Sequence, residues 1–187
     1  MVEVRALALE GVYELRPRRI SDERGFFSET WSRAALAAAG LDFDFVQENH
    51  SFSAARGVLR GLHYQLPPAA QDKLLRVSRG SVYDVVVDIR RSSPTFGRWL
   101  GLVISAESWN QVFIPKGFAH GFVTLEEATE VQYKVTAPYA ADRDRAVRFD
   151  DPAIGIDWPV APGGVVVSER DRNAPLLAGA EIADAWQ

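Results

Sequence analysis

Short runs of β-favouring residues, separated by glycine and proline, extend along the whole chain. The 187 residues include 14 glycines and 10 prolines. In the run 81–89, SVYDVVVDI, every second residue from Tyr83 to Ile89 shares one face, while Asp84 and Asp88 point the other way. Many short strands with turn residues between them are typical of a β-sandwich or β-barrel, so the sequence predicts an all-β fold.

Further segments have the composition of strands. They are 73–78 (KLLRVS), 100–105 (LGLVIS), 111–115 (QVFIP), 130–136 (EVQYKVT) and 163–168 (GGVVVS). In 130–136, Tyr133 lies between two valines on the face that is predicted to point inward. These runs are rich in branched and aromatic residues, which favour the pleated surface of a sheet.

Two segments could form helices. The alanine-rich stretch 28–42 predicts one helix, with Ser28 as its N-cap and Gly40 at its end. The residues 180–187, AEIADAWQ, could form a short C-terminal helix. Both would be small additions to a chain that is otherwise predicted to be strands and turns.

Size and composition indicate one domain over residues 1–187, without repeats or linkers. The net charge of −4 argues against nucleic acid or an anionic membrane as a partner, although a local basic pocket for a phosphorylated ligand is compatible with it. The absence of cysteine excludes disulfides, zinc ribbons and thiol nucleophiles. Residues 1–20 carry charges and no long apolar run, so neither a signal peptide nor a membrane span is expected, and the protein is expected to be cytoplasmic.

Two histidines have the spacing of known motifs. His63 follows Gly57 by six residues and His120 follows Pro115 by five, as in the two cupin motifs. The first motif normally continues with a second histidine, but this chain has Gln65 there, which is a poor ligand for a transition metal. The sequence therefore predicts a cupin-like double-stranded jelly roll with a few short helices and no metal.

The residues predicted near His63 favour a functional site. For His63 alone, a neutral, hydrogen-bonded histidine in the core is the simpler interpretation. Lys73 lies on the next predicted strand and Tyr133 on a predicted inward face, although a tyrosine alone is more often core or interface. Burying three such groups costs on the order of several kcal/mol unless they are partnered, and proteins tolerate that cost mainly at functional sites. His50, in a polar segment, is expected to be solvated.

Eight segments in order resemble the dTDP-4-dehydrorhamnose 3,5-epimerases and related deoxysugar epimerases. They are DERGFFSETW (22–31), FVQENHSFS (45–53), GVLRGLHYQ (57–65), AQDKLLRVSRGSVYDVVVDIRRSSPTFGRW (70–99), IPKGFAHGF (114–122), QYKVT (132–136), DDPAIGIDWP (150–159) and SERD (168–171). One such segment would be a weak indication, whereas eight at matching spacing are specific. The likeness runs nearly from end to end, and it is loosest at 137–148 and after Asp171.

The resemblance implies a metal-free jelly roll that forms a homodimer by exchanging strand contacts. The implied substrate is dTDP-4-dehydro-6-deoxy-D-glucose, whose 4-keto group acidifies the hydrogens at C3 and C5. An epimerase removes such a proton from one face of the sugar and returns one to the other, which gives dTDP-4-dehydro-L-rhamnose. No cofactor is expected, because the ketone of the substrate is itself the electron sink.

The same resemblance implies catalytic roles for four residues. His63 would be the base, since imidazole titrates near neutral pH. Asp171 matches the acid that orients this ring, although Asp84, on a neighbouring predicted strand, is a rival from the sequence alone. Lys73 would stabilise the enolate oxygen, and Tyr133 would protonate the carbanion from the opposite side.

Ten further positions match residues that bind the nucleotide sugar in the family. They are Arg24, Phe27, Glu29, Gln47, Asn49, Arg60, His120, Tyr139, Asp144 and Arg170. The forked guanidinium of arginine suits phosphate oxygens, and the two aromatic rings suit a slot for thymine. Asp144 stands where the family usually has glutamate, and Arg170 stands where lysine is common. Both departures bear on specificity.

The spacing of Arg60 and His63 predicts a local irregularity. Residues three apart point to opposite faces of a regular strand, so these two side chains could not line the same site. Both could do so if the strand bulges or twists near Gly61, or if one of them belongs to the site of a partner subunit.

Three functions remain open at this level. The first is the 3,5-epimerase. The second is a 3- or 5-epimerase that acts at one carbon in an antibiotic-sugar pathway, which would share the same catalytic residues. The third is a nucleotide-sugar-binding protein or metal cupin without epimerase activity. The set of His63, Lys73 and Tyr133 argues against a pure binding protein, and Gln65 argues against a metal oxygenase.

Overall fold

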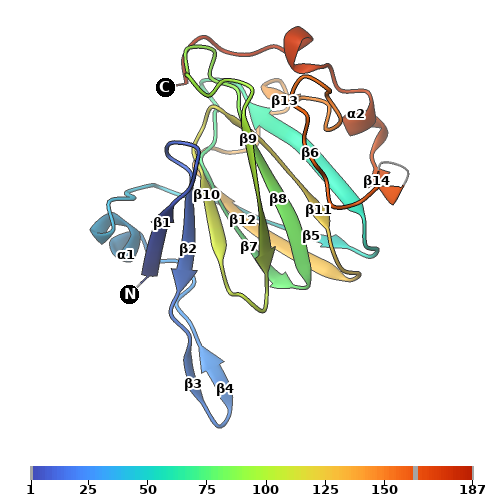
Figure 1. Ribbon diagram of the computed structural model, residues 1–187. Helices are drawn as coiled ribbons and strands as arrows, with labels where there is room; N and C mark the ends of the chain where they lie inside the picture. Colours follow the sequence, from blue (N-terminus) through green and yellow to red (C-terminus); the bar gives the residue numbers. More distant parts are fainter. Residues whose placement is uncertain (1, 162–163, 187) are drawn as a thin grey trace.

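Antiparallel strands form two facing sheets and one small hairpin (Figure 1). The computed structural model describes residues 2–161 and 164–186. The first sheet has the order β1 (Val2–Ala6), β2 (Tyr13–Pro17), β10 (Gln111–Ile114), β7 (Lys73–Arg79), β12 (Thr129–Val135) and β5 (Gln47–Ser53). The second has the order β13 (Asp144–Ala146), β6 (Val58–Gln65), β11 (Phe118–Thr124), β8 (Ser81–Asp88) and β9 (Trp99–Ser105). This is the all-β jelly roll that the sequence predicted.

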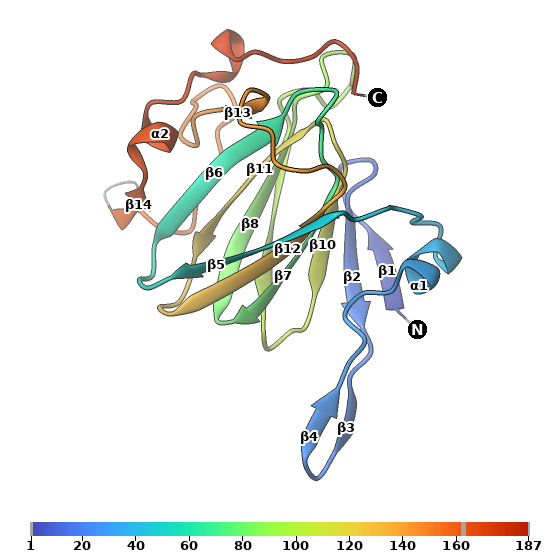
Figure 2. The ribbon, with the colours of Figure 1, turned by 180° about the vertical axis from the view of Figure 1, so that it is seen from behind.

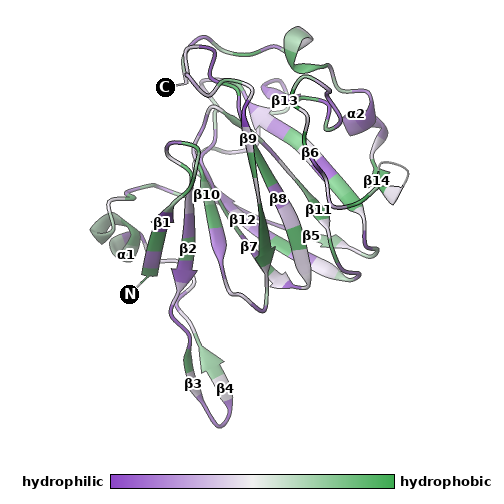
Figure 3. Cartoon of the chain, in the orientation of Figure 1, coloured by the Kyte–Doolittle hydropathy of each residue, from purple (hydrophilic) through white to green (hydrophobic). Residues whose placement is uncertain are grey.

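The predicted strands match the observed ones, with one exception near the end of the chain. Of the segment 163–168, only Val166–Val167 forms a strand, β14, which pairs in parallel with β6. Gly163 lies outside the described residues. Hydrophobic and hydrophilic residues are mixed along β6 (Figure 3), without the regular alternation of an undistorted strand.

The two faces of β8 pack against different layers. Val82 and Val86 belong to the cluster between the two sheets, which also contains Leu75 and Val131. Val85 and Val87 point the other way, into a second cluster that is closed by the C-terminal segment. Both faces are therefore buried, which explains the run of valines in this strand. Burial of each valine contributes roughly 1.5–3 kcal/mol.

The helix predicted at 28–42 is shorter than expected. Helix α1 (Arg33–Ala38) begins after Ser32, whose hydroxyl oxygen accepts the N–H of Ala35. The predicted N-cap, Ser28, is wrong, because its hydroxyl instead accepts a hydrogen bond from the Trp109 indole. Gly40 follows the last turn with φ +84°, which agrees with its predicted place at the helix end.

The predicted C-terminal helix is also wrong for the described residues 180–186. They run without helix over the second sheet, and Glu181 accepts a hydrogen bond from the Tyr64 hydroxyl through its backbone oxygen, at 2.7 Å. Packing against β6 thus competes with a helix too short to be stable by itself. Further helical turns include α2 (Glu169–Arg172) and the 3₁₀ turn Leu177–Gly179. Within the described part of the chain, no helix combines the length and hydrophobicity that crossing a bilayer needs.

A two-stranded arm extends away from the facing sheets. It consists of β3 (Ile20–Asp22) and β4 (Gly25–Phe27), and in Figures 1 and 2 it is the hairpin that projects beyond the lower end of β2. Phe26 and Phe27 are 51% and 69% exposed, respectively, so the arm presents apolar side chains to its surroundings.

Candidate active site

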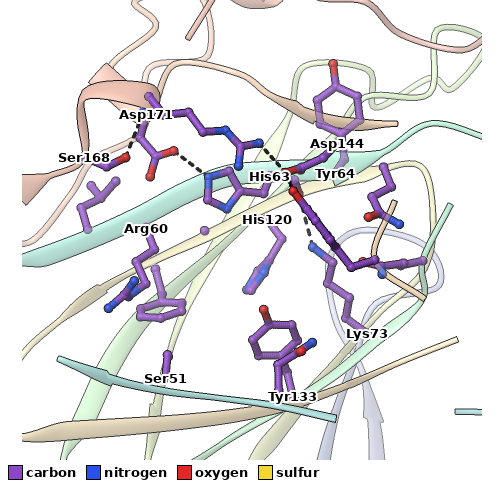
Figure 4. A pocket seen from close by; sticks show the side chains of 18 of the residues that line it. Ser51, Arg60, His63, Tyr64, Lys73, His120, Tyr133, Asp144, Ser168 and Asp171 are labelled. Carbon is purple, nitrogen blue, oxygen red and sulfur yellow. Dashed lines mark hydrogen bonds and ion pairs between the residues drawn. The ribbon is translucent and has the colours of Figure 1, made fainter. Parts of the chain in front are cut away.

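A cavity of about 570 Å³ opens between the sheets and contains the four predicted catalytic residues (Figure 4). His63 comes from β6, Lys73 from β7, Tyr133 from β12 and Asp171 from α2. These residues are far apart in the sequence and meet because β6 faces β7 and β12 across the interior. The prediction that they share one cavity is confirmed by the geometry, while their catalytic roles stay predictions.

The strand β6 carries the irregularity that the sequence predicted. Opposite β11, His63 pairs with His120 and Arg60 pairs with Phe122, so three steps along β6 match two along β11. This extra residue is a bulge, and it lets Arg60 and His63 line the same cavity. Gly61 has φ +123°, and a Cβ atom there would lie 2.5 Å from the Cα of Gly121.

His63 forms a pair with Asp171. The distance from His63 Nε2 to Asp171 Oδ1 is 2.7 Å, and the other carboxylate oxygen accepts the Gly61 N–H at 3.2 Å. Burial favours the neutral carboxyl group, but these hydrogen bonds outweigh it and hold the pKa of Asp171 below its ordinary value. The geometry thus decides between the two candidate carboxylates for His63 in favour of Asp171.

The rival carboxylate, Asp84, forms a second pair with His120. Asp84 Oδ2 lies 2.8 Å from His120 Nε2, and the Asp84 side chain is fully buried. Among the described residues, the other oxygen of Asp84 has no hydrogen-bond partner. This second pair was not among the predictions from the sequence. Asp84 shares a face of β8 with Val82 and Val86, which lie between the sheets, and a buried acid there needs a cationic or hydrogen-bonding partner.

Lys73 is buried beside the histidine pair. Its Nζ atom lies 3.4 Å from the backbone oxygen of His63, and the residue is 8% exposed. Burial lowers the pKa of Lys73 to about 8, although the carboxylates of Asp144 and Asp84 partly oppose this effect. The side chain can therefore exchange a proton near neutral pH, and as an ammonium group it is a strong hydrogen-bond donor toward the cavity.

Tyr133 lies on the far side of the cavity from His63 (Figure 4). Burial raises the pKa of its phenol above the ordinary value, and the carboxylate of Asp144 adds to this effect while Arg60 opposes it. The phenol therefore stays protonated through the neutral range. His63, which can accept a proton, and Tyr133, which can donate one, thus face each other across a space of ligand size.

Seven of the ten predicted binding residues line the same cavity. They are Gln47, Asn49, Arg60, His120, Tyr139, Asp144 and Arg170. Asp144 accepts from both Arg170, at 2.7 Å, and the Tyr139 hydroxyl, at 3.1 Å. The cavity is also lined by Ser51, Gln71 and Ser168, which sequence reasoning missed. Ser168 could have been found from the sequence, because S-x-x-D is the pattern of a helix N-cap. In the structure its hydroxyl accepts the Asp171 N–H.

The remaining three, Arg24, Phe27 and Glu29, do not line this cavity. Arg24 and Phe27 lie on the projecting arm, where Arg24 forms an ion pair with Asp22. Phe27 and Glu29 border a separate hollow of about 270 Å³ at the base of the arm. Within one subunit, the structure therefore does not bring these three residues to the predicted site, because the hairpin directs them away from the sheets.

The side chains of Gln65 and His50 are engaged elsewhere. The Gln65 amide donates to the backbone oxygens of Ala69 and Pro138 and accepts the N–H of Ala140. Gln65, at the position of the second cupin histidine, therefore ties two loops together. His50 is half exposed and lies 3.1 Å from Glu130, in agreement with the predicted surface position.

The comparisons with known proteins agree with this arrangement. The family model for dTDP-4-dehydrorhamnose 3,5-epimerase matches residues 6–179. Two curated relatives of that name, from Sinorhizobium fredii and Pseudomonas aeruginosa, are each 48% identical, and the matches cover 92% and 94% of this chain and 88% and 96% of the relatives. A crystal structure of that enzyme from Bacillus anthracis, with TDP and PPi bound, has a TM-score of 0.91 and 44% identity, covering 94% of this chain and 99% of the other.

Proposed function

This chain belongs to the dTDP-4-dehydrorhamnose 3,5-epimerase family, and we propose a mechanism in which His63 and Tyr133 move protons at opposite faces of the sugar. The enzyme is an isomerase that converts dTDP-4-dehydro-6-deoxy-D-glucose to dTDP-4-dehydro-L-rhamnose by epimerisation at C3 and C5. The observation that carries the mechanism is the placement of an imidazole–carboxylate pair, an ammonium group and a phenol around one cavity.

Proton removal begins at His63. A carboxylate can only accept hydrogen bonds, so His63 Nε2 carries the hydrogen that faces Asp171, and Nδ1 is left with a lone pair. Nδ1 accepts the proton from the carbon next to the ketone, and the resulting imidazolium is stabilised by the charge of Asp171. The electrons of the broken C–H bond move to the C4 oxygen, which becomes an enolate.

Lys73 and Tyr133 complete the reaction. The ammonium group of Lys73 donates to the enolate oxygen, where a buried charge is most effective. Tyr133 then gives its proton to the carbanion from the face opposite His63, which inverts the carbon. Afterwards the phenolate is reprotonated and His63 releases its proton. The same cycle at the second carbon completes the change to the rhamnose configuration.

The nucleotide and diphosphate require their own anchors. Arg60 and Arg170 are the cationic side chains that bind the diphosphate, and Tyr139 provides an aromatic surface for thymine. Because Asp144 already pairs with Arg170, the bound diphosphate must share this guanidinium with a carboxylate. Gln47 and Asn49, which hydrogen-bond to each other at 2.8 Å, and His120 supply further polar contacts.

The three residues outside the cavity fit a homodimer. Arg24, Phe27 and Glu29 match binding positions of the family but lie on or next to the arm, away from their own cavity. In a symmetric pair the arm of each subunit reaches the cavity of the other, which also covers its exposed phenylalanines. The cytoplasmic location and the one-domain organisation stay predictions.

Incubation with dTDP-4-dehydro-6-deoxy-D-glucose in deuterated water tests the proposal. We expect deuterium at both C3 and C5, with a product of rhamnose configuration. Incorporation at one carbon would point to a single-position epimerase, and incorporation at neither carbon would refute the activity. The His63→Asn variant should lose exchange at both carbons by at least about 10²-fold, and near-normal exchange would refute its role as the base.

A further inference from the structure

The residue Trp109 has an unusual backbone conformation. It lies in the turn between β9 and β10 with φ +57°. This left-handed region is uncommon for residues with a side chain, and it is a marked exception for a bulky one. Such a conformation persists only where the contacts of the residue compensate for it, so the surroundings of Trp109 indicate what the conformation achieves.

Those surroundings are the base of the projecting arm. The indole Nε1 of Trp109 donates a hydrogen bond to Ser28 Oγ at 3.0 Å, just after β4. The Phe26 ring meets the indole edge-on, with centroids 4.8 Å apart and an interplanar angle of 77°. One side chain of the β9–β10 turn thus makes close contacts with β4 and with the residue after this strand.

Two arginines join the same cluster from different directions. The guanidinium carbons of Arg19 and Arg76 each lie 5.6 Å from the centroid of the Trp109 ring. Arg19, before β3, also lies over Phe26 and donates to the backbone oxygen of Glu107 at 3.1 Å. Arg76, on β7, is held by Gln132 at 2.9 Å. The cluster therefore connects β4 and the residue before β3 to the turn and to the body of the first sheet.

The turn that carries Trp109 is itself held by hydrogen bonds of the next residue. The buried Asn110 donates to Glu14 at 2.8 Å and to the backbone oxygen of Val103 at 2.9 Å, and its own oxygen accepts the N–H of Ser105. The backbone next to Trp109 is thus fixed to β2 and β9. The arm, by contrast, has two strands of three residues each, and all six are exposed. A hairpin of this kind is marginally stable alone, so its direction depends on contacts at its base.

We propose that Trp109 is a positioning residue, whose contacts with Ser28, Phe26 and Arg19 fix the direction of the arm. The inference rests on the proposed function, in which the arm of one subunit completes the cavity of the other. A fixed arm presents Arg24 and Phe27 to the partner's cavity without an ordering step, so substrate binding does not have to supply that ordering. A loose arm would bind the same substrate more weakly.

The substitutions Trp109→Ala and Trp109→Gly separate this role from simple stability. Both remove the contacts with the arm, but glycine also relieves the left-handed conformation. We expect both variants to raise KM about 10-fold while kcat stays within about 2-fold, because the catalytic groups of the cavity are untouched. Trypsin should cleave after Arg24 faster than in the unchanged protein, and the glycine variant should unfold at a higher temperature than the alanine variant.

The variant Arg24→Ala, measured in parallel, separates failure of the inference from failure of the proposed function. A raised KM in Arg24→Ala together with a normal KM in both Trp109 variants would overturn the positioning role of Trp109 and leave the arm's role intact. A normal KM in Arg24→Ala would overturn the arm's role, and the inference with it. A raised KM in all three variants, with faster tryptic cleavage in the Trp109 variants, supports the proposal.

Discussion

At the scale of single residues, burial and hydrogen bonding give the groups of one cavity different proton affinities. Desolvation lowers the pKa of Lys73 to about 8 and raises that of Tyr133, while hydrogen bonds lower that of Asp171 despite its burial. Near neutral pH the cavity therefore holds a carboxylate, a protonated phenol and a lysine close to its titration point. Such separation of acids and bases by their environment is a mark of catalytic sites.

The pKa of Lys73 leads to a prediction about pH dependence. If the ammonium form stabilises the enolate, kcat/KM should decline as the pH rises through about 8. Asp84 raises the pKa of Lys73, so Asp84→Asn should move this alkaline limb to lower pH. The measurement is a pH profile of kcat/KM for both proteins.

A control variant is available for this experiment. Asp142 forms an exposed ion pair with Arg143 outside the cavity lining, so Asp142→Asn should leave the limb in place. An alkaline limb that stays unchanged in Asp84→Asn, or that moves to higher pH, would contradict the assignment of the limb to Lys73.

At the scale of elements, the bulge in β6 decides which side chains meet. One extra residue between Arg60 and His63 turns their side chains to the same side of the strand. The predicted base, His63, and the predicted phosphate ligand, Arg60, therefore line one cavity. The short helix α2 has a similar effect, because it brings Asp171 to a strand more than a hundred positions earlier in the chain. The pair of His63 and Asp171 thus depends on two local elements.

Gly61→Ala tests the bulge. A methyl group would meet the backbone of Gly121 and His120, and φ +123° is strained for alanine, so we expect a loss of about 2–4 kcal/mol in the free energy of unfolding and a large fall in kcat. Gly179→Ala is the matched control, since no atom lies within 4 Å of the added Cβ, and it should change stability by less than about 0.5 kcal/mol. Urea unfolding measures both. Equal stabilities for the two variants would contradict the close approach at Gly61.

At the scale of the whole molecule, the two sheets have different neighbours. The second sheet is covered outside by the C-terminal segment, and part of the first is covered by α1 and the residues that follow it. The arm alone extends into open space, with apolar side chains that the described residues of one subunit leave exposed. This contrast is the structural basis for expecting a second copy of the chain at the arm.

Mixing two impaired variants tests whether the arm acts in the partner. The cavity is intact in Arg24→Ala and the arm is intact in His63→Asn, so a mixed dimer contains one complete composite site. With random pairing, the mixture should recover about a quarter of the unchanged activity at substrate concentrations that do not saturate Arg24→Ala. Activity no higher than the sum of the separate variants would contradict an arm that acts between subunits. Size-exclusion chromatography with light scattering checks that dimers are present.

The resemblance to the family supplied most of the predicted site residues, and periodicity along the chain added two predictions about their placement. Alternation placed Tyr133 on an inner face, and the spacing of Arg60 and His63 required an irregular strand, which the register of β6 and β11 confirms. The helix ends were predicted less well. Ser28 and Ser32 are both reasonable N-caps by sequence, and a contact with Trp109, eighty-one positions away, decided between them. Competition with such distant partners is not visible in a local pattern.

By itself, the sequence determined the all-β fold, the strands and the set of polar residues that had to be buried together. Alternation and turn residues act over a few positions, and their physical consequences are local. Tertiary structure alone decided that Asp171 pairs with His63, that Asp84 pairs with His120 and that Arg24 points away from its own cavity. These outcomes depend on how strands and loops distant in sequence are brought together, because hydrogen bonds and burial act through space and not along the chain.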